Sequence, residues 1–289
     1  MLTRLGLAFI WLLHFLPLAL LAPLGRGFGM LLYVLAAERR RVVHKNLASC
    51  FPEQSAKERG RLARRHFQAL GRSLLERGII WWSSRERVMR VVRMEGEEHW
   101  RVHAKEPVVW LAPHFVGLDM GGTRLAAEHR AISVYSRQKN PAFDAVLYHG
   151  RTRFVMPELF SRQDGIRPVI KAMRTGLPFY YLPDMDFGER DSIFVPFFGV
   201  RAATITGLSR IARMGRARVI PTVTYQVPGS QGYVLKFYPA WDNFPTDDIE
   251  ADTRRMNAFI EQCVLEHPEQ YFWVHKRFKT RPPGEARFY

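Results

Sequence analysis

The stretch PVVWLAPHFVGLD, residues 107–119, joins an apolar run to a histidine and then to an acid. Residues 107–112 carry no charge and are followed by Pro113, a pattern typical of a short buried strand. His114 comes directly after it, where the strand ends. Because α/β proteins bind ligands beyond the carboxyl ends of their parallel strands, the stretch predicts a functional histidine at the edge of a parallel sheet.

The remaining chain alternates short apolar runs with helical patterns. Residues 54–92 read as a charged amphipathic helix. Further strands are predicted at 132–135, 179–182, 219–225 and 234–238, and helices near 118–128, 142–153, 165–175, 204–215 and 251–266. Such alternation predicts an α/β fold with a mainly parallel central sheet flanked by helices.

The amino terminus has the composition of a membrane element. Leu5–Gly25 contains no charged residue and would be about 31 Å long as a helix, enough to cross a hydrocarbon core of about 30 Å. Pro17, Pro23 and His14 interrupt it, so we expect a membrane anchor that either spans the bilayer or dips into it. A buried pair of core helices is the alternative.

The charge distribution gives the expected orientation. Arg39–Arg41 follows the apolar segment, and this downstream positive charge favours a cytoplasmic location for the rest of the chain. We therefore divide the chain into a membrane-associated helical segment, residues 1–37, and a catalytic domain, residues 38–289.

Composition excludes several classes of protein. Hydrophobic residues make up 47% of the 289 residues, which is incompatible with general disorder. The two cysteines, Cys50 and Cys263, exclude a disulfide-stapled module and have no metal-binding spacing. A net charge of +16 indicates an anionic partner: nucleic acid, an anionic membrane surface, or a phosphorylated or acidic substrate. The apolar amino terminus favours the membrane.

His114 and Asp119 form the candidate catalytic pair. With His114 on a turn and Asp119 in the first turn of the following helix, the carboxylate would hydrogen-bond the imidazole, fix its tautomer and support its protonated form. The chain has no G-x-S-x-G nucleophile motif. We therefore expect His114 to act as a general base on a hydroxyl of the substrate, which attacks an ester or thioester.

Two other functions are compatible with parts of the sequence. Asp184-Met-Asp186 has the D-x-D form found in metal-dependent glycosyltransferases, although no glycine-rich nucleotide cradle accompanies it. Charge alone would also permit a membrane-tethered protein that binds nucleic acid or anionic lipid without catalysis, but no zinc finger, RNA-recognition or helix-turn-helix signature supports binding to nucleic acid.

Several blocks in one order resemble the late acyltransferases of bacterial lipid A biosynthesis, within the lysophospholipid acyltransferase superfamily. The blocks are RRRVVHKNLASCFPE (39–53), the H-x4-D motif (114–119), QKNPAFD (138–144), GRTRF (150–154), DGIRPVIKAMRTG (164–176), LPDMDFGERDSIFVPFFGVRAATIT (182–206) and PEQYFWVHKRFKTRPPGE (268–285). Many members of the family carry Glu at the position of Asp119.

This resemblance implies a glycerolipid acyltransferase-like fold and a reaction. The enzyme would move an acyl group from acyl-carrier protein to a hydroxyl on an acyl chain of a lipid A precursor, with no metal or cofactor. A lysophospholipid or another glycolipid is the alternative acceptor, and coenzyme A the alternative donor. The location would be the cytoplasmic face of the bacterial inner membrane, among anionic lipids and without nucleic acid.

The resemblance also assigns residues. His114 matches the family's base and Asp119 its orienting acid. The positions that match substrate-binding residues are Arg151, Arg153, Asp184 and Asp186. We further expect Val195–Gly199 either to line an acyl-chain channel or to belong to the core. A basic cluster near the end of the chain would meet lipid headgroups or the acidic face of a carrier protein, or be a solvated surface; it comprises His275, Lys276, Arg277, Lys279 and Arg281.

Overall fold

A seven-stranded sheet forms the centre of the computed structural model, which describes residues 2–155, 157–161 and 164–289. The strand order is β1-β9-β8-β2-β5-β3-β4, and every neighbouring pair is parallel except β8–β9. The strands are β1 (Val92–Glu95), β2 (Val108–Leu111), β3 (Ile132–Tyr135), β4 (Glu158–Ser161), β5 (Phe179–Tyr181), β8 (Arg218–Gln226) and β9 (Tyr233–Phe237). The predicted mainly parallel sheet is confirmed.

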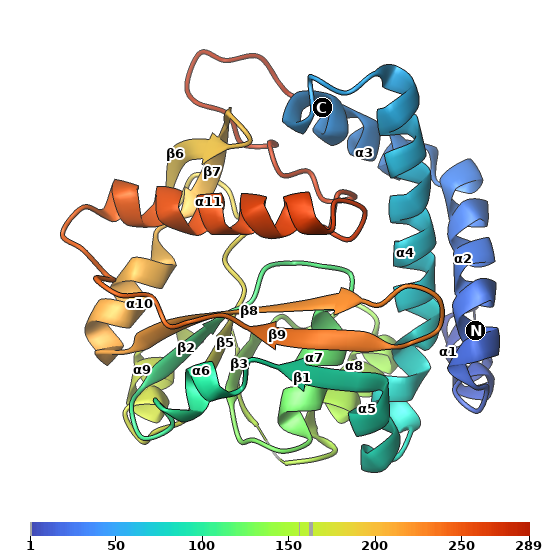
Figure 1. Cartoon of the computed structure of the whole chain (residues 1–289), viewed down its shortest axis with the longest axis horizontal. Helices are drawn as coiled ribbons and strands as arrows, with labels where there is room; N and C mark the ends of the chain where they lie inside the picture. The colour runs from blue at the N-terminus through green and yellow to red at the C-terminus, as the bar shows by residue number, and fades with distance from the viewer. Residues whose placement is uncertain (1, 156, 162–163) are drawn as a thin grey trace.

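Helices cover both faces of this sheet (Figure 1). The long helix α11 (Ile249–Glu266) lies on one face, and α7 (Leu118–Ala126) and α8 (Pro141–Thr152) lie on the other. Val109 and Leu111 of β2 enter the core on the α11 side, whereas Trp110 enters the core on the opposite side. Both faces of β2 are therefore buried, which explains why its sequence is a continuous apolar run.

The other helices and one hairpin complete the domain. The predicted helix over 54–92 is two helices, α4 (Ala56–Trp82) and α5 (Arg85–Val91), followed by β1. Helix α4 begins with a capping box between Ser55 and Glu58. The remaining elements are α3 (Ala37–Cys50), α6 (Glu98–Arg101), α9 (Arg167–Met173), α10 (Gly207–Gly215) and the antiparallel hairpin of β6 (Ser192–Phe197) and β7 (Val200–Ile205). The sequence did not predict α3, α6, β1, β4 or this hairpin.

The amino terminus is two helices instead of one continuous apolar helix. Helix α1 (Leu2–Leu13) ends before Pro17, and α2 (Leu18–Leu35) begins directly after it. Proline disfavours the helical conformation in the preceding residue, which explains the break. Helix α2 is long and apolar enough to cross a membrane, with 22% of its residues buried in the protein. Both helices lie beside α4 (Figure 1).

Candidate active site

His114 lies just beyond the end of β2, in a loop fixed by backbone hydrogen bonds. The Ala112 amide donates to the Tyr181 carbonyl at 2.8 Å, which extends the pairing of β2 with β5. The His114 carbonyl accepts from the Phe272 amide at 2.9 Å, so the carboxyl-terminal segment of the chain closes over the loop. The imidazole itself is 17% exposed. The predicted place of His114, at the carboxyl edge of a parallel sheet, is confirmed.

Asp184, and not Asp119, is the partner of the His114 ring. Nδ1 of His114 lies 2.7 Å from one carboxylate oxygen of Asp184, and the His114 amide donates to the other oxygen at 2.9 Å. The register explains the contact: Leu111 of β2 pairs with Tyr181 of β5, and each site residue follows three positions later. Asp184 is 1% exposed. The ring is therefore fixed with Nδ1 occupied and Nε2 available for proton transfer.

The carboxylate of Asp184 is ionised despite its burial. Burial by itself raises the pKa of Asp184, but the His114 ring, its hydrogen bonds and the Arg277 guanidinium together hold that pKa below its ordinary value. Arg277 is 2% exposed and donates to the Ala203 carbonyl and the Thr204 hydroxyl, both at 2.7 Å. The fixed Arg277 guanidinium thus stabilises the Asp184 carboxylate, which in turn holds the His114 ring.

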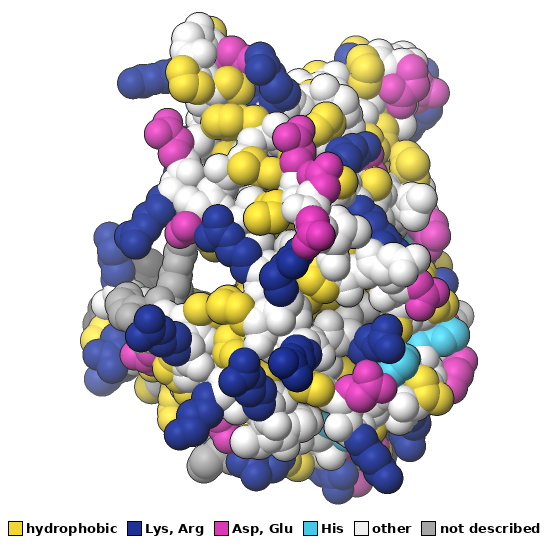
Figure 2. Space-filling view, turned by 90° about the vertical axis from the view of Figure 1, so that its left-hand side faces the viewer, with side chains coloured by type: hydrophobic (Ala, Val, Ile, Leu, Met, Phe, Trp, Pro, Cys, Tyr) yellow, Lys and Arg dark blue, Asp and Glu magenta, His cyan; other side chains and the backbone are white. Residues whose placement is uncertain are grey.

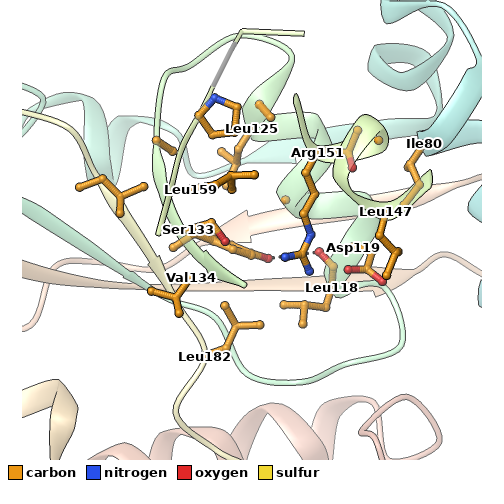
Figure 3. Close-up of a pocket in the computed structure, with 18 of the residues that line it drawn as sticks. Ile80, Leu118, Asp119, Leu125, Ser133, Val134, Leu147, Arg151, Leu159 and Leu182 are labelled. Carbon is orange, nitrogen blue, oxygen red and sulfur yellow. Dashed lines mark hydrogen bonds between the residues drawn. The ribbon is translucent and has the colours of Figure 1, made fainter. Parts of the chain in front are cut away.

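Asp119 makes a different ion pair. Its carboxylate accepts from the Arg77 guanidinium of α4 at 2.8 Å, and Asp184 takes its expected place as the acceptor for the His114 ring. Burial alone raises the pKa of Asp119, but the charges of Arg77, Arg151 and His114 lower it by more, so the net shift is downward. Figure 3 shows the Arg151 guanidinium beside Asp119. Arg77, Asp119 and Arg151 come from helices α4, α7 and α8, respectively.

Two neighbouring cavities share Arg151 in their linings. The larger cavity, about 860 Å³, is lined by His114 and by aromatic, aliphatic and basic side chains that include Tyr148, Met185 and Arg210. The smaller one, about 100 Å³, is a mostly apolar pocket between α4, α7, α8 and the sheet. Figure 3 shows its lining, with Arg151 and Asp119 among the aliphatic side chains of Ile80, Leu118, Leu125, Val134, Leu147, Leu159 and Leu182.

Basic side chains gather on the surface near the larger cavity. Arg190 and Arg210 line it, with side chains that are 96% and 52% exposed. Figure 2 shows many Lys and Arg side chains over the lower half of the face that forms the left-hand side of Figure 1. An anionic ligand approaching this face would meet a favourable potential.

The other two predicted substrate-binding residues have structural contacts. Asp186 is 7% exposed, and its carboxylate accepts from the amide and hydroxyl of Thr280, each at 2.7 Å, and from the Gly188 amide at 3.0 Å. Arg153 donates to the Ser83 carbonyl, stacks 4.2 Å from the centre of the Phe154 ring, and has its pKa lowered to about 10 by burial. Asp186 joins the loop after β5 to the chain's end, and Arg153 joins α8 to the α4–α5 junction.

Comparison with known proteins identifies the family. Residues 1–280 match the sequence profile of the bacterial lipid A biosynthesis acyltransferase family. The chain belongs to this family. The lipid A biosynthesis lauroyltransferase of Escherichia coli (strain K12) is 38% identical over 98% of this acyltransferase and 93% of that protein. The lipid A biosynthesis myristoyltransferase of the same organism is 34% identical, over 93% and 83% of the two chains.

Several chains of solved structures also match the lipid A acyltransferase. One of them is the 1-acyl-sn-glycerophosphate (LPA) acyltransferase PlsC from Thermotoga maritima, with 15% identity, a TM-score of 0.39, and coverage of 86% of this chain and 96% of that one. The family assignment confirms the sequence-based resemblance and makes the chain an enzyme that transfers acyl groups in lipid A biosynthesis.

Only part of the carboxyl-terminal basic cluster of this acyltransferase is internal: Arg277 is buried, whereas Lys279 is exposed. His275 accepts a hydrogen bond from the Asp186 amide at 2.9 Å, and burial, followed by the charge of Arg277, lowers its pKa to about 4. Lys276 pairs with Glu38 of α3 at 2.9 Å. The interpretation of the basic cluster as a surface for headgroups is therefore wrong for His275 and Arg277.

The stretch Val195–Gly199 is expected from the sequence either to line an acyl-chain channel or to belong to the core. Its residues Val195 and Phe197 are buried in the core.

Sequence reasoning missed Arg77, placed Arg277 in a basic surface cluster, and gave Asp184 a different role. Arg77 sits in a helix rich in arginine, so no local signal separates it from its neighbours. Asp184 had a usable signal: Pro183-Asp184 follows one strand as Pro113-His114 follows another. Pairing those two strands in register would have predicted the contact in this acyltransferase.

Proposed function

We propose that this enzyme transfers an acyl group from the thioester of acyl-carrier protein to a hydroxyl on an acyl chain of a lipid A precursor, with His114 as general base. The observation that carries the proposal is the His114 ring, which lies on the wall of the larger cavity and is held from behind by the buried and ionised Asp184. Nε2 takes the proton of the acceptor hydroxyl as its oxygen attacks the thioester carbonyl. A C–O bond forms, the C–S bond breaks, and the imidazolium returns the proton to the leaving thiolate.

Arg151, Asp119 and Arg77 form the polar group beside this histidine. Arg151 lines both cavities, so its guanidinium would meet the carbonyl of an acyl group whose tail lies in the smaller pocket. Its planar fork is suited to an oxyanion or a phosphate. Asp119 and Arg77 would hold Arg151 in place instead of orienting His114.

The smaller pocket, about 100 Å³ in volume, would receive part of the acyl tail of the donor. Its walls are mostly aliphatic and aromatic, and the polar groups concentrate around Arg151 and Asp119. Burying each methylene in such a pocket contributes about 0.8 kcal/mol, so its depth would select the chain length. The basic side chains of Arg190 and Arg210 favour an acidic carrier protein or the phosphates of the acceptor.

The location proposed for the enzyme is the cytoplasmic face of the bacterial inner membrane, with residues 1–37 as the membrane-associated segment and 38–289 as the catalytic domain. Support comes from the apolar amino-terminal helices and from the net charge of +16, which attracts anionic lipids.

A reconstituted assay tests this proposal. The full chain in detergent micelles is given radiolabelled acyl-carrier protein thioester and a lipid A precursor, and the product is analysed by mass spectrometry. The wild type should transfer the acyl group, and His114→Ala should lose about 10²–10⁴-fold in kcat. Near-normal turnover of His114→Ala would refute the base. Replacing the acceptor by a lysophospholipid, or the donor by acyl-coenzyme A, should reduce turnover; faster turnover with either would change the assigned substrate.

A further inference from the structure

Helices α1 and α2 expose an unusually apolar surface, which we call the hairpin face. Its large side chains are each more than half exposed: Leu5, Phe9, Leu12, Phe15, Leu20, Leu24, Leu31, Val34 and Leu35. So many exposed large apolar side chains on two consecutive helices are unusual for a soluble monomer and indicate an interaction site. Arg4 near its start and Arg39 and Arg41 after its end are exposed cations. Apolar side chains flanked by arginines match a bilayer surface with anionic headgroups.

We propose that the hairpin face lies in one leaflet of the membrane and that neither helix crosses the bilayer. The proposal rests on the membrane location proposed above and is independent of the acyl-transfer chemistry. Three sets of contacts carry it, because each attaches the hairpin to the catalytic domain at a different height.

The first contact is a backbone-to-backbone packing of α2 on α4. A Cβ atom added to Gly29 would lie 2.0 Å from the Phe67 carbonyl oxygen, and one added to Gly71 would lie 2.3 Å from the Gly29 nitrogen. No lipid fits between the helices at this point. Because α4 carries several arginines, including Arg72 and Arg77, it cannot accompany α2 into hydrocarbon without a large cost.

The second contact fixes the middle of α2. Arg26 lies halfway along the helix and donates to the Gly229 carbonyl at 3.2 Å. Arg72 of α4 donates to the same carbonyl at 3.2 Å and to the Val227 carbonyl at 2.9 Å. These carbonyls belong to the turn between β8 and β9. If α2 crossed the bilayer, Arg26 and this polar turn would both lie near its centre, where one arginine alone costs about 2.5–3.5 kcal/mol.

The third set of contacts fixes both ends of α1. Asn140, which caps α8, donates to the Thr3 hydroxyl at 2.9 Å. At the other end of α1, Arg87 of α5 donates to the carbonyls of His14 and Leu16 in the turn before α2. The start of the hairpin and its turn are thus both joined to the catalytic domain. A spanning helix would have to place its two ends on opposite sides of a core about 30 Å thick.

This arrangement explains how a lipid acceptor reaches the site. Helix α8 contacts α1 and also contributes Leu147, Tyr148 and Arg151 to the larger cavity. Tyr148 is 51% exposed. With the hairpin face in the leaflet, the rim of the cavity lies near the membrane surface, and the acceptor can enter sideways without leaving the bilayer.

Cysteine labelling tests the topology. Cys50 and Cys263 are 4% and 2% exposed, so the full chain has little background labelling by a membrane-impermeant maleimide. Arg4→Cys reports on α1, and Ala48→Cys on the exposed surface of α3 as a cytoplasmic reference. We expect both to be labelled in inverted inner-membrane vesicles and neither in right-side-out vesicles. Labelling of Arg4→Cys from the periplasmic side, with Ala48→Cys labelled from the cytoplasmic side, would overturn the proposal.

A binding measurement tests the hairpin face itself. Leu12→Glu with Leu24→Glu should weaken partition of the purified full chain onto phosphatidylglycerol-containing vesicles roughly 100-fold, because two leucines lose their apolar burial. Leu265→Glu, the same change at a leucine of α11 that is 61% exposed, is the matched control and should partition like the wild type. Equal partition of the double variant and the wild type would refute the hairpin face. Failure of the wild type itself to partition would refute the membrane location instead.

Discussion

Replacing Asp184 by Asn separates the two carboxylates that could support His114. In the wild type, one carboxylate oxygen of Asp184 accepts from the backbone N–H of His114 at 2.9 Å. The side-chain oxygen of the new Asn must take that position, because its NH₂ group cannot accept. Its NH₂ group then faces Nδ1, which becomes an acceptor, and the ring proton moves to Nε2. A histidine protonated on Nε2 cannot take a proton from the acceptor hydroxyl.

The expected loss follows from these contacts. Removal of general-base assistance alone costs about 10²–10⁴-fold. The variant also loses a charge-assisted hydrogen bond to the imidazolium, worth about 1.5–3 kcal/mol. We therefore expect Asp184→Asn to reduce kcat by at least about 10²-fold with little change in KM, because Asp184 does not line the larger cavity. Asp119→Asn should reduce kcat much less, since the hydrogen bond of Asp184 to the ring remains.

The measurement is steady-state acyl transfer by both variants, with thermal unfolding in detergent as a check that each is folded. Asp184 is buried near Arg277, so some loss of stability is expected. The reasoning would be refuted if a folded Asp184→Asn kept more than about a tenth of wild-type kcat while Asp119→Asn lost 10²-fold. That order would restore Asp119 as the partner of His114.

Three further predictions concern single residues. Arg77→Met should leave stability within about 1 kcal/mol, since the Asp119 partner is 36% exposed, but should raise the Asp119 pKa, because Arg77 is the strongest of the charges that lower it; an NMR titration of the Asp119 carboxyl that shows no rise would contradict this. Gly122→Ala should shorten the preferred acyl chain, because its Cβ would lie 3.3 Å from Tyr180 in the smaller pocket, and each lost methylene contact is worth about fourfold in donor competition; unchanged preference would show that the tail lies elsewhere. Burial lowers the pKa of His66 from 6.5 to about 4, so between these pH values the unfolded chain binds a proton that the folded chain does not. The free energy of unfolding should therefore fall by up to about 1.4 kcal/mol per pH unit from pH 6.5 down to 4. His66→Gln should reduce the pH dependence of the thermal-unfolding midpoint over that range.

The sequence predicted the parts of the site that local patterns encode. The continuous apolar run of residues 107–112 indicates a strand buried on both faces, and the structure has β2 there with His114 beyond its end. The strand at 132–135 and the helix at 251–266 were also found within two residues of their ends. In each case burial and period are both visible within one short window.

The partner of His114 could not be read from such a window. Asp119 is near His114 in sequence, whereas Asp184 is near it only because β2 and β5 are neighbours in register. That pairing is a long-range contact between strands that are far apart in the chain, and no local property of either strand specifies it. A pairing argument that starts from the matching Pro113-His114 and Pro183-Asp184 steps would have been needed.

The amino terminus shows the same limit for membrane topology. Its hydropathy identifies an apolar segment but says nothing about what packs against it. Gly25, Gly29 and Gly71 acquire meaning only when α2 and α4 are placed side by side, where their missing side chains let two backbones touch. A helix whose glycine face is covered by an arginine-rich neighbour has only its opposite face left for lipid. Mean hydropathy counts both faces of a helix equally. Helix α2 therefore has the composition of a membrane span although it packs against the catalytic domain along its length.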